Sequence, residues 1–206
     1  MSRTRPLLLA LLLAVVPTSG CVVADGGGSA GSVATAPSPG TPPDDAPGGP
    51  AEDRMARALF DRVNAEREAR GLQPVAWDDA LAEIAADWSR SMAETGVLEH
   101  QDMRSLLDRD DLEGFAGIGE NVFTASGPLP AGHAHVGWMR SDGHRVNVLN
   151  PGWDRLGVGV FCAPDGSTWA TQQFGRTVDA DRPQVSDETP PTEPIARPEE
   201  DGPSCG

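Results

Sequence analysis

The chain has 206 residues, with 31 acidic and 16 basic side chains and a formal net charge of −15 at pH 7. This length allows one domain of ordinary size together with extensions. Within residues 51–178, twenty acidic and twelve basic residues leave a net charge of −8. Because this part of the sequence has no basic patch, its composition argues against nucleic acid and anionic lipid head groups as partners.

Residues 1–24 have the pattern of a secretion signal. Two arginines precede an apolar run at residues 7–16, and Pro17 and small residues follow it. An apolar run of this length is about half of what crosses a bilayer, so a permanent membrane span is not predicted. The mature chain is therefore predicted to be extracytoplasmic.

The segment Thr18-Ser-Gly-Cys21 resembles the lipobox of bacterial lipoproteins, in which the cysteine becomes the lipidated first residue of the mature protein. Its first position is Thr18, where leucine is usual. The alternative is ordinary cleavage after residues 22–24, which removes Cys21. The two alternatives predict either a lipid anchor on the outer face of the cell membrane, as the only membrane contact, or a secreted protein.

Disulfide bonds persist in an extracytoplasmic protein. Processing accounts for Cys21 in both alternatives, which leaves Cys162 and Cys205 as the natural pair. A bond between them would connect the C-terminal tail to the domain. The alternative is two free thiols.

Two segments outside the domain are predicted to be disordered. Half of the positions in residues 25–50 are Gly or Pro, which is typical of a flexible linker. Residues 179–206 form an acidic, Pro-rich tail. The folded domain is therefore predicted to cover residues 51–178.

A first helix is predicted from Asp53, a suitable N-cap, to about Arg70, before Gly71. Its apolar residues share one face, which is expected to face the core: Met55, Leu59, Phe60 and Val63. Its charged residues are expected mostly to face water: Arg57, Asp61, Arg62, Glu66 and Arg67.

A second helix is predicted from Asp78 or Asp79 to Gly96. Its apolar residues recur at three- and four-residue spacing, which predicts a stripe that faces the core. The residues of this stripe are Leu81, Ile84, Ala85, Trp88 and Met92.

The rest of the domain is predicted to mix helices and strands. Residues 103–112 and 131–140 are expected to be helical, and residues 120–124 to start a strand. Strands at 156–162 and 168–174 flank turn-forming residues, which predicts an antiparallel hairpin whose glycines allow a helix to pack closely. Helices first and a hairpin last indicate an α+β or layered α/β/α class.

Residues 138–151 form a dense polar segment between a predicted helix and a predicted strand. Around His144, the side chains of Ser141 and Arg145 provide more hydrogen-bonding groups than a connecting loop needs. This segment is predicted to form one wall of a site. Two other polar points are expected to converge on it, His100 and the Gly119-Glu120-Asn121 triplet.

Two imidazoles and a carboxylate, from His100, His144 and Glu120, are a suitable ligand set for Zn²⁺ or a similar divalent cation. The carboxylate can instead fix the tautomers of the imidazoles or accept a proton. The three residues are far apart in sequence, so spacing alone does not identify a metal site. By residue type alone, His144 and the Glu120-Asn121 pair also suit a purely structural role.

Other candidate groups are weaker. His133 and His135 are predicted to be surface residues, because at i, i+2 they point to different faces of a helix. Ser141 precedes His144 by three residues, but no Gly-x-Ser-x-Gly elbow surrounds it, which argues against a serine hydrolase. Cys162 lies in a predicted strand and has a disulfide partner, which argues against a catalytic thiol.

Four motifs follow the two predicted helices in a fixed order: Gly-Glu-Asn at 119–121, Trp-Met-x-Ser-x-Gly-His-Arg-x-Asn-x-Leu at 138–149, Gly-Val-Gly-Val at 157–160 and Gln-Phe-Gly at 173–175. This order resembles the CAP superfamily, the cysteine-rich secretory, antigen 5 and pathogenesis-related proteins, also called SCP domains. The similarity covers roughly residues 54–176. It is closest to the bacterial type, which lacks the multiple disulfides of eukaryotic members.

The resemblance implies a three-layer α/β/α sandwich with a small, mainly antiparallel sheet and an open cleft lined by two histidines and acidic residues. In the family the histidine pair can hold a divalent ion such as Zn²⁺, and His100 and His144 match that pair. Glu120 matches the first cleft glutamate. The second, which many eukaryotic members carry, falls on Ser141 here, and this departure weakens any mechanism that requires two acids.

These observations support three hypotheses. The first is a cell-envelope binding module that captures a small apolar ligand, a peptide or an envelope component in or beside the cleft. The alternative is a metal-dependent hydrolase or peptidase, in which His100 and His144 bind the metal and Glu120 is the catalytic base. In the third, His144 and Glu120 only hold the polar segment against the sheet.

Overall fold

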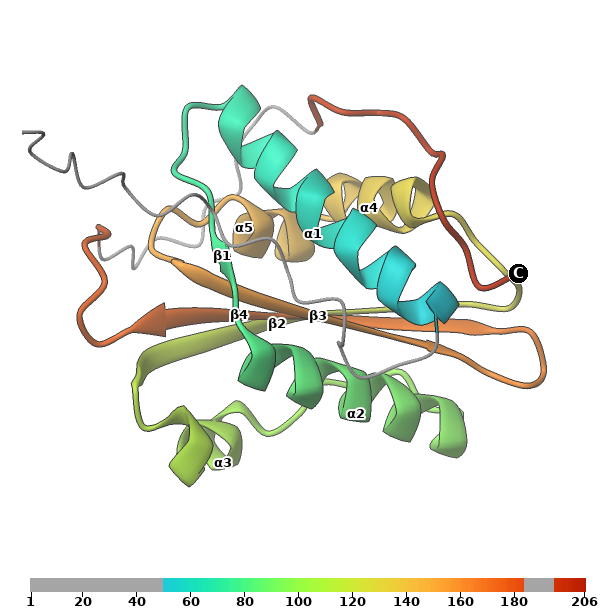
Figure 1. Cartoon of the computed structure of the whole chain (residues 1–206), viewed down its shortest axis with the longest axis horizontal. Helices are drawn as coiled ribbons and strands as arrows, with labels where there is room; N and C mark the ends of the chain where they lie inside the picture. Colours follow the sequence, from blue (N-terminus) through green and yellow to red (C-terminus); the bar gives the residue numbers. More distant parts are fainter. Residues whose placement is uncertain (1–49, 184–194) are drawn as a thin grey trace, which may run out of the picture. The chain divides into compact units, whose positions relative to one another are not determined.

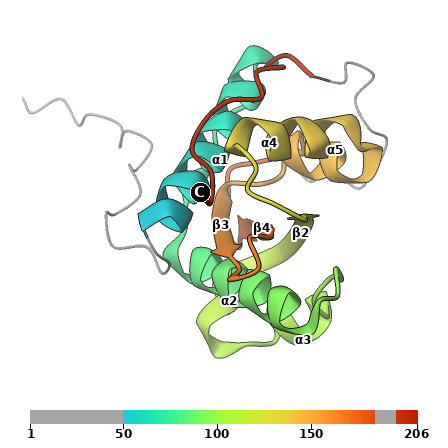
Figure 2. The ribbon, with the colours of Figure 1, turned by 90° about the vertical axis from the view of Figure 1, so that its right-hand side faces the viewer.

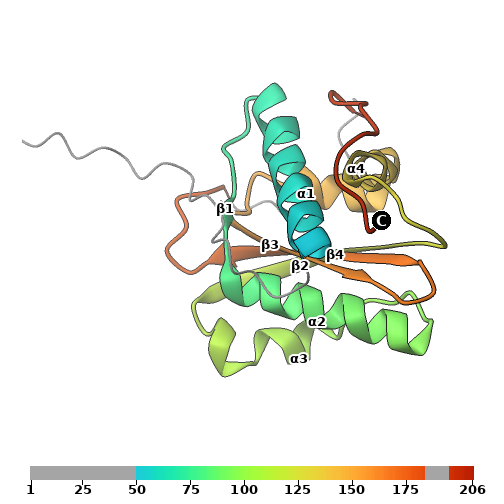
Figure 3. The same cartoon turned by 45° about the vertical axis from the view of Figure 1, so that its right-hand side comes forward.

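A four-stranded sheet forms the middle layer of the fold, with β1 (Ala76–Trp77), β3 (Arg155–Cys162), β4 (Thr168–Thr177) and β2 (Phe115–Ala125) in that order. One face is covered by α1 (Pro50–Ala69), α4 (Ala131–Arg140) and α5 (Asp142–Val148), as Figure 1 shows. The other face is covered by α2 (Asp79–Thr95) and α3 (Met103–Leu107), which Figure 3 shows from a second side. These layers confirm the predicted α/β/α sandwich with a mainly antiparallel sheet.

The computed structural model describes residues 50–183 and 195–206. The predicted signal at 1–24, with Cys21 and its predicted lipid, and the predicted linker up to residue 49 lie outside these ranges. Within the described ranges, no helix has both the length and the apolar character needed to cross a bilayer.

Helix α1 begins at Pro50 rather than at the predicted cap Asp53, because proline suits the first turn of a helix. Two of its charged residues contradict the prediction of a solvent-facing side, since Glu66 and Arg67 are fully buried. Burial lowers the pKa of Arg67 to about 10, with a smaller contribution from the charge of Arg182. The Arg67 guanidinium compensates by donating to the backbone oxygen of the nearby Gln73 and to those of the distant Val148 and Asn150.

Helix α2 has the predicted boundaries and packs directly on strand β3. The Asp78 carboxylate accepts a hydrogen bond from the backbone nitrogen of Leu81 at 3.0 Å, and Gly96, with a φ of 70°, ends the helix. A Cβ atom at Gly159 would lie 2.0 Å from the backbone nitrogen of Ala86. Glycine in β3 therefore permits this close contact, as predicted.

Strands β3 and β4 form the predicted antiparallel hairpin. Strand β4 also pairs antiparallel with β2, an edge strand that extends beyond the predicted residues 120–124 at both ends. Strand β1 pairs in parallel with β3 and was not predicted, because two residues are too few to show a periodic pattern.

The predicted helix at 131–140 is confirmed as α4, whereas residues 142–148 of the polar segment form an unpredicted short helix, α5. The predicted helix at 103–112 consists of α3 and a separate 3₁₀ turn, η1 (Asp110–Leu112). The prediction that His135 lies at the surface is wrong. Its side chain is fully buried, because its face of α4 packs against α1, where Nε2 lies 3.6 Å from Oε1 of Glu66.

Residues 195–206, hereafter the strap, run along α1 and α4 (Figure 2). The predicted bond between Cys162 and Cys205 is confirmed and joins the strap to β3. The prediction of a disordered tail is therefore wrong for the strap, and residues 182 and 183 are also held, by hydrogen bonds from Arg176. Composition does not reveal these contacts because their partners are far along the chain. Residues 184–194 lie outside the described ranges.

Candidate functional site

The predicted site residues meet at the edge strand β2. Side chains alternate between the two faces of a strand, so Glu120 and Asn121 point to opposite sides of the sheet. Glu120 contacts His100, which lies between α2 and α3, and Asn121 contacts the backbone of His144 in α5. The two histidines therefore approach the same sheet edge from opposite faces.

The carboxylate of Glu120 interacts with three nitrogen atoms. Its Oε1 lies 2.7 Å from Nδ1 of His100 and accepts from the backbone nitrogen of Gln101 at 3.2 Å, and its Oε2 accepts from Nε2 of Gln101 at 2.7 Å. The Glu120 side chain is 1% exposed, whereas that of His100 is 56% exposed. Because a carboxylate accepts, Nδ1 of His100 carries the hydrogen, and its Nε2 is the ring atom available to a ligand.

Two glutamines support this arrangement, Gln173 from strand β4 and Gln101 from the segment before α3. The Oε1 atom of Gln173 in β4 accepts from Nε2 of Gln101 at 3.3 Å, and its own Nε2 donates to the backbone oxygen of Gly119 at 3.1 Å. Gln173 belongs to the Gln-Phe-Gly motif, whereas Gln101 is a site residue that no motif indicates. Its position directly after His100 is the one sequence signal for it.

Asn121 connects β2 to α5. Its Nδ2 donates to the backbone oxygen of His144 at 3.1 Å and to Oε1 of Gln172 at 3.0 Å. In return, Nδ2 of Asn147 donates to the backbone oxygen of Glu120 and to Oδ1 of Asn121, both at 3.0 Å. The Gly-Glu-Asn and His-Arg-x-Asn motifs are thus bonded to each other, which fixes His144 beside Glu120.

His144 is partly buried and lies close enough to His100 for their charges to interact. Burial lowers the pKa of His144, and the charge of His100 lowers it further. At neutral pH His144 is therefore a neutral imidazole, whose lone pair can bind a metal ion or accept a hydrogen bond.

Two other predicted site residues position α5. The buried Arg145 donates from NH1 to the backbone oxygen of Met139 at 2.9 Å and from NH2 to Oδ1 of Asp142 at 2.6 Å. The backbone oxygen of Ser141 accepts from the backbone nitrogen of Arg145 at 2.8 Å. These bonds fix the bend between α4 and α5, and with it the position of His144.

The donor set fits a divalent cation only in part. Over residues 50–183 and 195–206, no group of three or more His, Cys, Asp or Glu side chains is placed to hold a metal ion. His100 and His144 supply two ring nitrogens, and both oxygens of Glu120 already accept hydrogen bonds. The arrangement suits a cation with two protein ligands, a carboxylate that orients one of them, and further positions filled by water or ligand.

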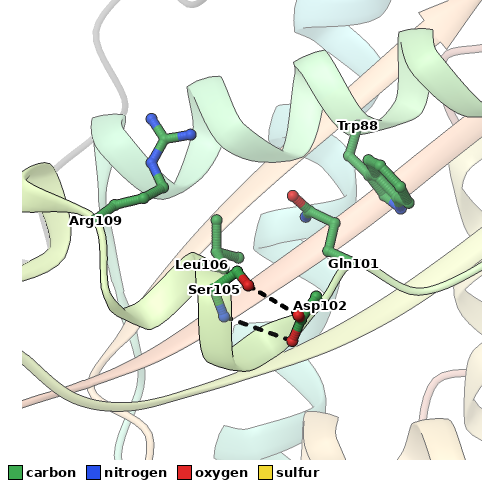
Figure 4. Close-up of a pocket in the computed structure, with 6 residues that line it drawn as sticks. All are labelled: Trp88, Gln101, Asp102, Ser105, Leu106 and Arg109. Carbon is green, nitrogen blue, oxygen red and sulfur yellow. Dashed lines mark hydrogen bonds between the residues drawn. The ribbon is translucent and has the colours of Figure 1, made fainter.

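A pocket of about 260 Å³ lies between α2 and α3, on the His100 side of the sheet (Figure 4). Trp88 contributes an aromatic wall, and its Nε1 donates to the backbone oxygen of Glu99 at 2.9 Å. Gln101 both lines this pocket and bonds to Glu120, so the pocket adjoins the histidine site. The lining residues are Trp88, Gln101, Asp102, Ser105, Leu106 and Arg109.

The model of the cysteine-rich secretory protein family, CAP, matches residues 60–174, which is more than half of the chain. The chain belongs to the CAP family. The matched range contains every site residue described above and confirms the resemblance found in the sequence motifs. The strap of this CAP protein lies outside the matched range.

Two Bacillus subtilis proteins are similar to this CAP protein. The uncharacterized protein YkwD is 35% identical over 123 residues, which are 57% of this chain and 46% of the relative. The uncharacterized membrane protein YlbC is 37% identical over 109 residues, 50% of this chain and 31% of the relative. The CAP chain thus matches less than half the length of these curated relatives.

A solved structure shows the same fold. It is the crystal structure of an extracellular protein with an SCP domain from Bacillus anthracis, which superposes with a TM-score of 0.52 and is 28% identical. The superposition covers 65% of this chain and 45% of the relative. This CAP protein is therefore of the bacterial type.

Proposed function

We propose that this CAP protein is an extracytoplasmic binding module that holds a small ligand at His100 and His144. The observation that carries the proposal is the contact of Glu120 with Nδ1 of His100, which leaves Nε2 of a half-exposed imidazole for a ligand. The secretion signal predicted at residues 1–24 and the extracellular Bacillus anthracis relative support the location.

Two features favour binding over hydrolysis. Glu120 accepts three hydrogen bonds and is almost completely buried, so it is poorly placed to take a proton from an attacking water molecule. Ser141, at the position of the second cleft glutamate of many relatives, provides no carboxylate in its place. A metal-dependent hydrolase with Glu120 as its base is therefore the weaker candidate.

The surroundings of the histidines indicate the chemistry of the ligand. The adjoining pocket combines the apolar surface of Trp88 and Leu106 with polar side chains. Val97 and Leu98, shortly before His100, are each 48% exposed. This combination suits an amphipathic ligand, such as a hydrophobic peptide or a fragment of an envelope lipid, with its apolar part in the pocket and a polar end at the imidazoles.

A divalent cation such as Zn²⁺ would use the same two imidazoles. His100 and His144 would hold it, and Glu120 would keep His100 in the correct tautomer. When bound, the cation would supply positive charge for an anionic group of the ligand. Because two side chains of the protein would bind the cation, further coordination positions stay open to the organic ligand. The affinity of the site for the cation is therefore expected to rise when the organic ligand is present.

A zinc titration by calorimetry tests the histidine pair. The mature chain should bind Zn²⁺, and both His100→Ala and His144→Ala should lose this binding. The matched control is His133→Ala, because His133 is also half-exposed but lies in α4 beside the strap. Zinc binding that persists in both site variants would contradict the assigned pair.

Thermal melts with hydrophobic peptides, sterols and lipid fragments test the organic ligand. A stabilising ligand should lose its effect in Ser105→Trp, which fills the pocket, and keep it in Ser105→Ala and in Arg104→Trp, a neighbouring exposed position that does not line the pocket. Stabilisation that survives Ser105→Trp would place the ligand elsewhere. Hydrolysis of a peptide or ester panel that needs metal and vanishes in His144→Ala would favour the hydrolase instead.

A further inference from the structure

The strap contacts the start of helix α4 through its backbone. The backbone oxygen of Pro203 accepts from the nitrogen of Ala131 at 2.9 Å, and that of Asp201 accepts from the nitrogen of Gly132 at 2.8 Å. These nitrogens belong to the first turn of α4, whose N-cap residue Pro130 makes no side-chain capping bond. The strap carbonyls therefore take the place of a capping side chain.

Helix α1 contacts the backbone of the strap through two side chains. The carboxylate of Glu66 accepts from the backbone nitrogens of residues 196 and 197, at 3.1 and 3.0 Å. The guanidinium of Arg62 donates to the backbone oxygens of residues 199 and 201, at 2.9 and 3.0 Å. With the strap in place Glu66 is fully buried and the Arg62 side chain is 18% exposed, so helix α1 and the strap enclose these contacts.

The backbone of the strap lies very close to the backbone of helix α4 at Gly132. A Cβ atom at Gly132 would lie 2.5 Å from the backbone oxygens of both Glu199 and Asp201. We call the residues that contact the strap in this way the strap surface: Arg62, Glu66, Ala131, Gly132, His133 and Arg140.

The strap surface also matches the charge of the strap. Arg62 pairs with the carboxylate of Asp201, and the Glu200 carboxylate lies 3.3 Å from His133 and 3.7 Å from Arg140. Acidic side chains on the strap thus face basic groups on α1 and α4. The surface accordingly suits an acidic peptide in an extended conformation.

We propose that the strap surface binds the strap of a second copy of this chain in place of the chain's own strap. The strap has the backbone groups, the acid Asp201 and the thiol of Cys205 at the spacing that this surface requires. Eleven residues, 184–194, join it to the domain, a length that reaches at most about 40 Å when extended. Exchange of identical segments between protomers is a low-cost route to dimers. The proposal is independent of the histidine site.

The disulfide bond between Cys162 and Cys205 determines whether a domain keeps its own strap or the strap of the second copy. A small thiolate attacks the Cys205 sulfur in one copy, forms a mixed disulfide with it and releases the Cys162 thiolate. The Cys162 thiolate then attacks the Cys205 sulfur of an intact bond in a second copy. The new S–S bond forms as the old one breaks, and the electron pair leaves with the Cys162 thiolate of the second copy, so the exchange consumes no oxidant.

The first test uses the full chain with Cys21→Ser and Cys205→Ser, which leaves Cys162 as the single thiol. The probe is a synthetic peptide of residues 195–206 whose Cys205 carries thionitrobenzoate in a mixed disulfide. Attack by Cys162 on the peptide sulfur releases thionitrobenzoate, which is measured by its absorbance. We expect reaction about tenfold faster than with a scrambled peptide that keeps the cysteine position, because binding raises the local concentration of the disulfide.

A pair of variants checks the assignment of the strap surface. Adding Glu66→Gln should remove the rate advantage, whereas Glu68→Gln, on the exposed side of α1, should keep it. Circular dichroism melts establish that both variants are folded. Equal rates for the two peptides, or an advantage that survives Glu66→Gln, would overturn the binding site.

The second test asks whether identical chains exchange straps. Natural chains with and without ¹⁵N label are mixed with a small amount of dithiothreitol, alkylated and digested. We expect fragments linked through Cys162 and Cys205 to include pairs with one labelled and one unlabelled partner. Linked fragments that always carry the same label would overturn exchange between copies.

Discussion

The Nδ1 atom of His100 lies 2.7 Å from Oε1 of Glu120, across a separation of twenty residues in the chain. The imidazole is 56% exposed and the carboxylate only 1%, so a buried acid holds an accessible base in one orientation. A carboxylate in this position fixes the ring tautomer and strengthens the other ring nitrogen as a ligand. This contact is the basis of the binding position proposed at the edge of β2.

Glu120→Gln should weaken zinc binding by about 10- to 100-fold, the usual effect of removing a group that orients a metal-binding histidine. A glutamine amide accepts hydrogen bonds only at its oxygen, so it cannot accept from both His100 and the Gln101 side chain as the Glu120 carboxylate does. His100 then loses its fixed tautomer. Calorimetry measures the affinity, and ¹⁵N spectra of the imidazole measure the tautomer without any metal. The matched control is the exposed Glu113→Gln. An unchanged tautomer in Glu120→Gln would refute this role.

His144 should titrate below its ordinary pKa of 6.5, because burial and then the charge of His100 both disfavour its protonated form. Zinc bound at His144 should therefore persist to a lower pH than at an ordinary imidazole. The unfolded chain binds the proton more readily, so this group makes the fold less stable as pH falls below about 6.5. NMR titration tests this directly, and in His100→Ala the midpoint should rise but stay below the ordinary value. A midpoint above 6.5 would contradict the prediction.

Gly159→Ala should destabilise the domain by about 3 kcal/mol, at the upper end for an overpacked core. The added Cβ would lie 2.0 Å from the backbone nitrogen of Ala86, and neither backbone can escape by a change of rotamer. Urea unfolding measures the free energy. Gly114→Ala serves as the control, since a Cβ there has no neighbour within 4 Å. Similar stabilities for the two variants would show that α2 does not pack directly on β3.

Glu66→Gln should lower stability at neutral pH and change its dependence on acid. Burial raises the pKa of Glu66, but the contacts with His135, the strap nitrogens and Arg70 outweigh it and bring the pKa down to about 2, from an ordinary 4.5. A depressed carboxylate pKa contributes stability that is present above about 4.5 and is lost as pH falls through about 2. The difference in unfolding free energy between the natural chain and Glu66→Gln should therefore shrink as pH falls from about 4.5 to about 2. Denaturant melts recorded at successive pH values measure this difference. Glu68→Gln should show no such convergence.

Local signals were sufficient for several elements of the fold. The cap Asp78, the stop Gly96 and an apolar stripe between them predicted α2, and alternation around a turn predicted the β3–β4 hairpin. These signals act within a few residues, so they can be read without the rest of the chain. Strand β1 and helix α5 are too short to show such a pattern.

The candidate site was predictable as residue types but not as an arrangement. Glu120 and His144 lie in sequence motifs and His100 was a separate polar candidate, yet the separation of the three residues left open whether they are ligands, bases or braces. The pairing of β2 with β4 and the bonds from Asn121 to α5 bring these three residues to one edge of the sheet. Gln101 joins them there, because it follows His100 in the chain and its side chain bonds to Glu120.

By itself, the sequence determined α2, the hairpin and the family, and it indicated the pairing of Cys162 with Cys205, which the structure confirms. Only the tertiary structure decided that Glu66 and His135 are buried and that the strap is ordered. The physical reason is that the contacts of Glu66 with His135 and with the backbone of Arg197 join residues more than sixty positions apart in the chain. No local period or composition records such a contact, because it exists only when the distant segments have packed together.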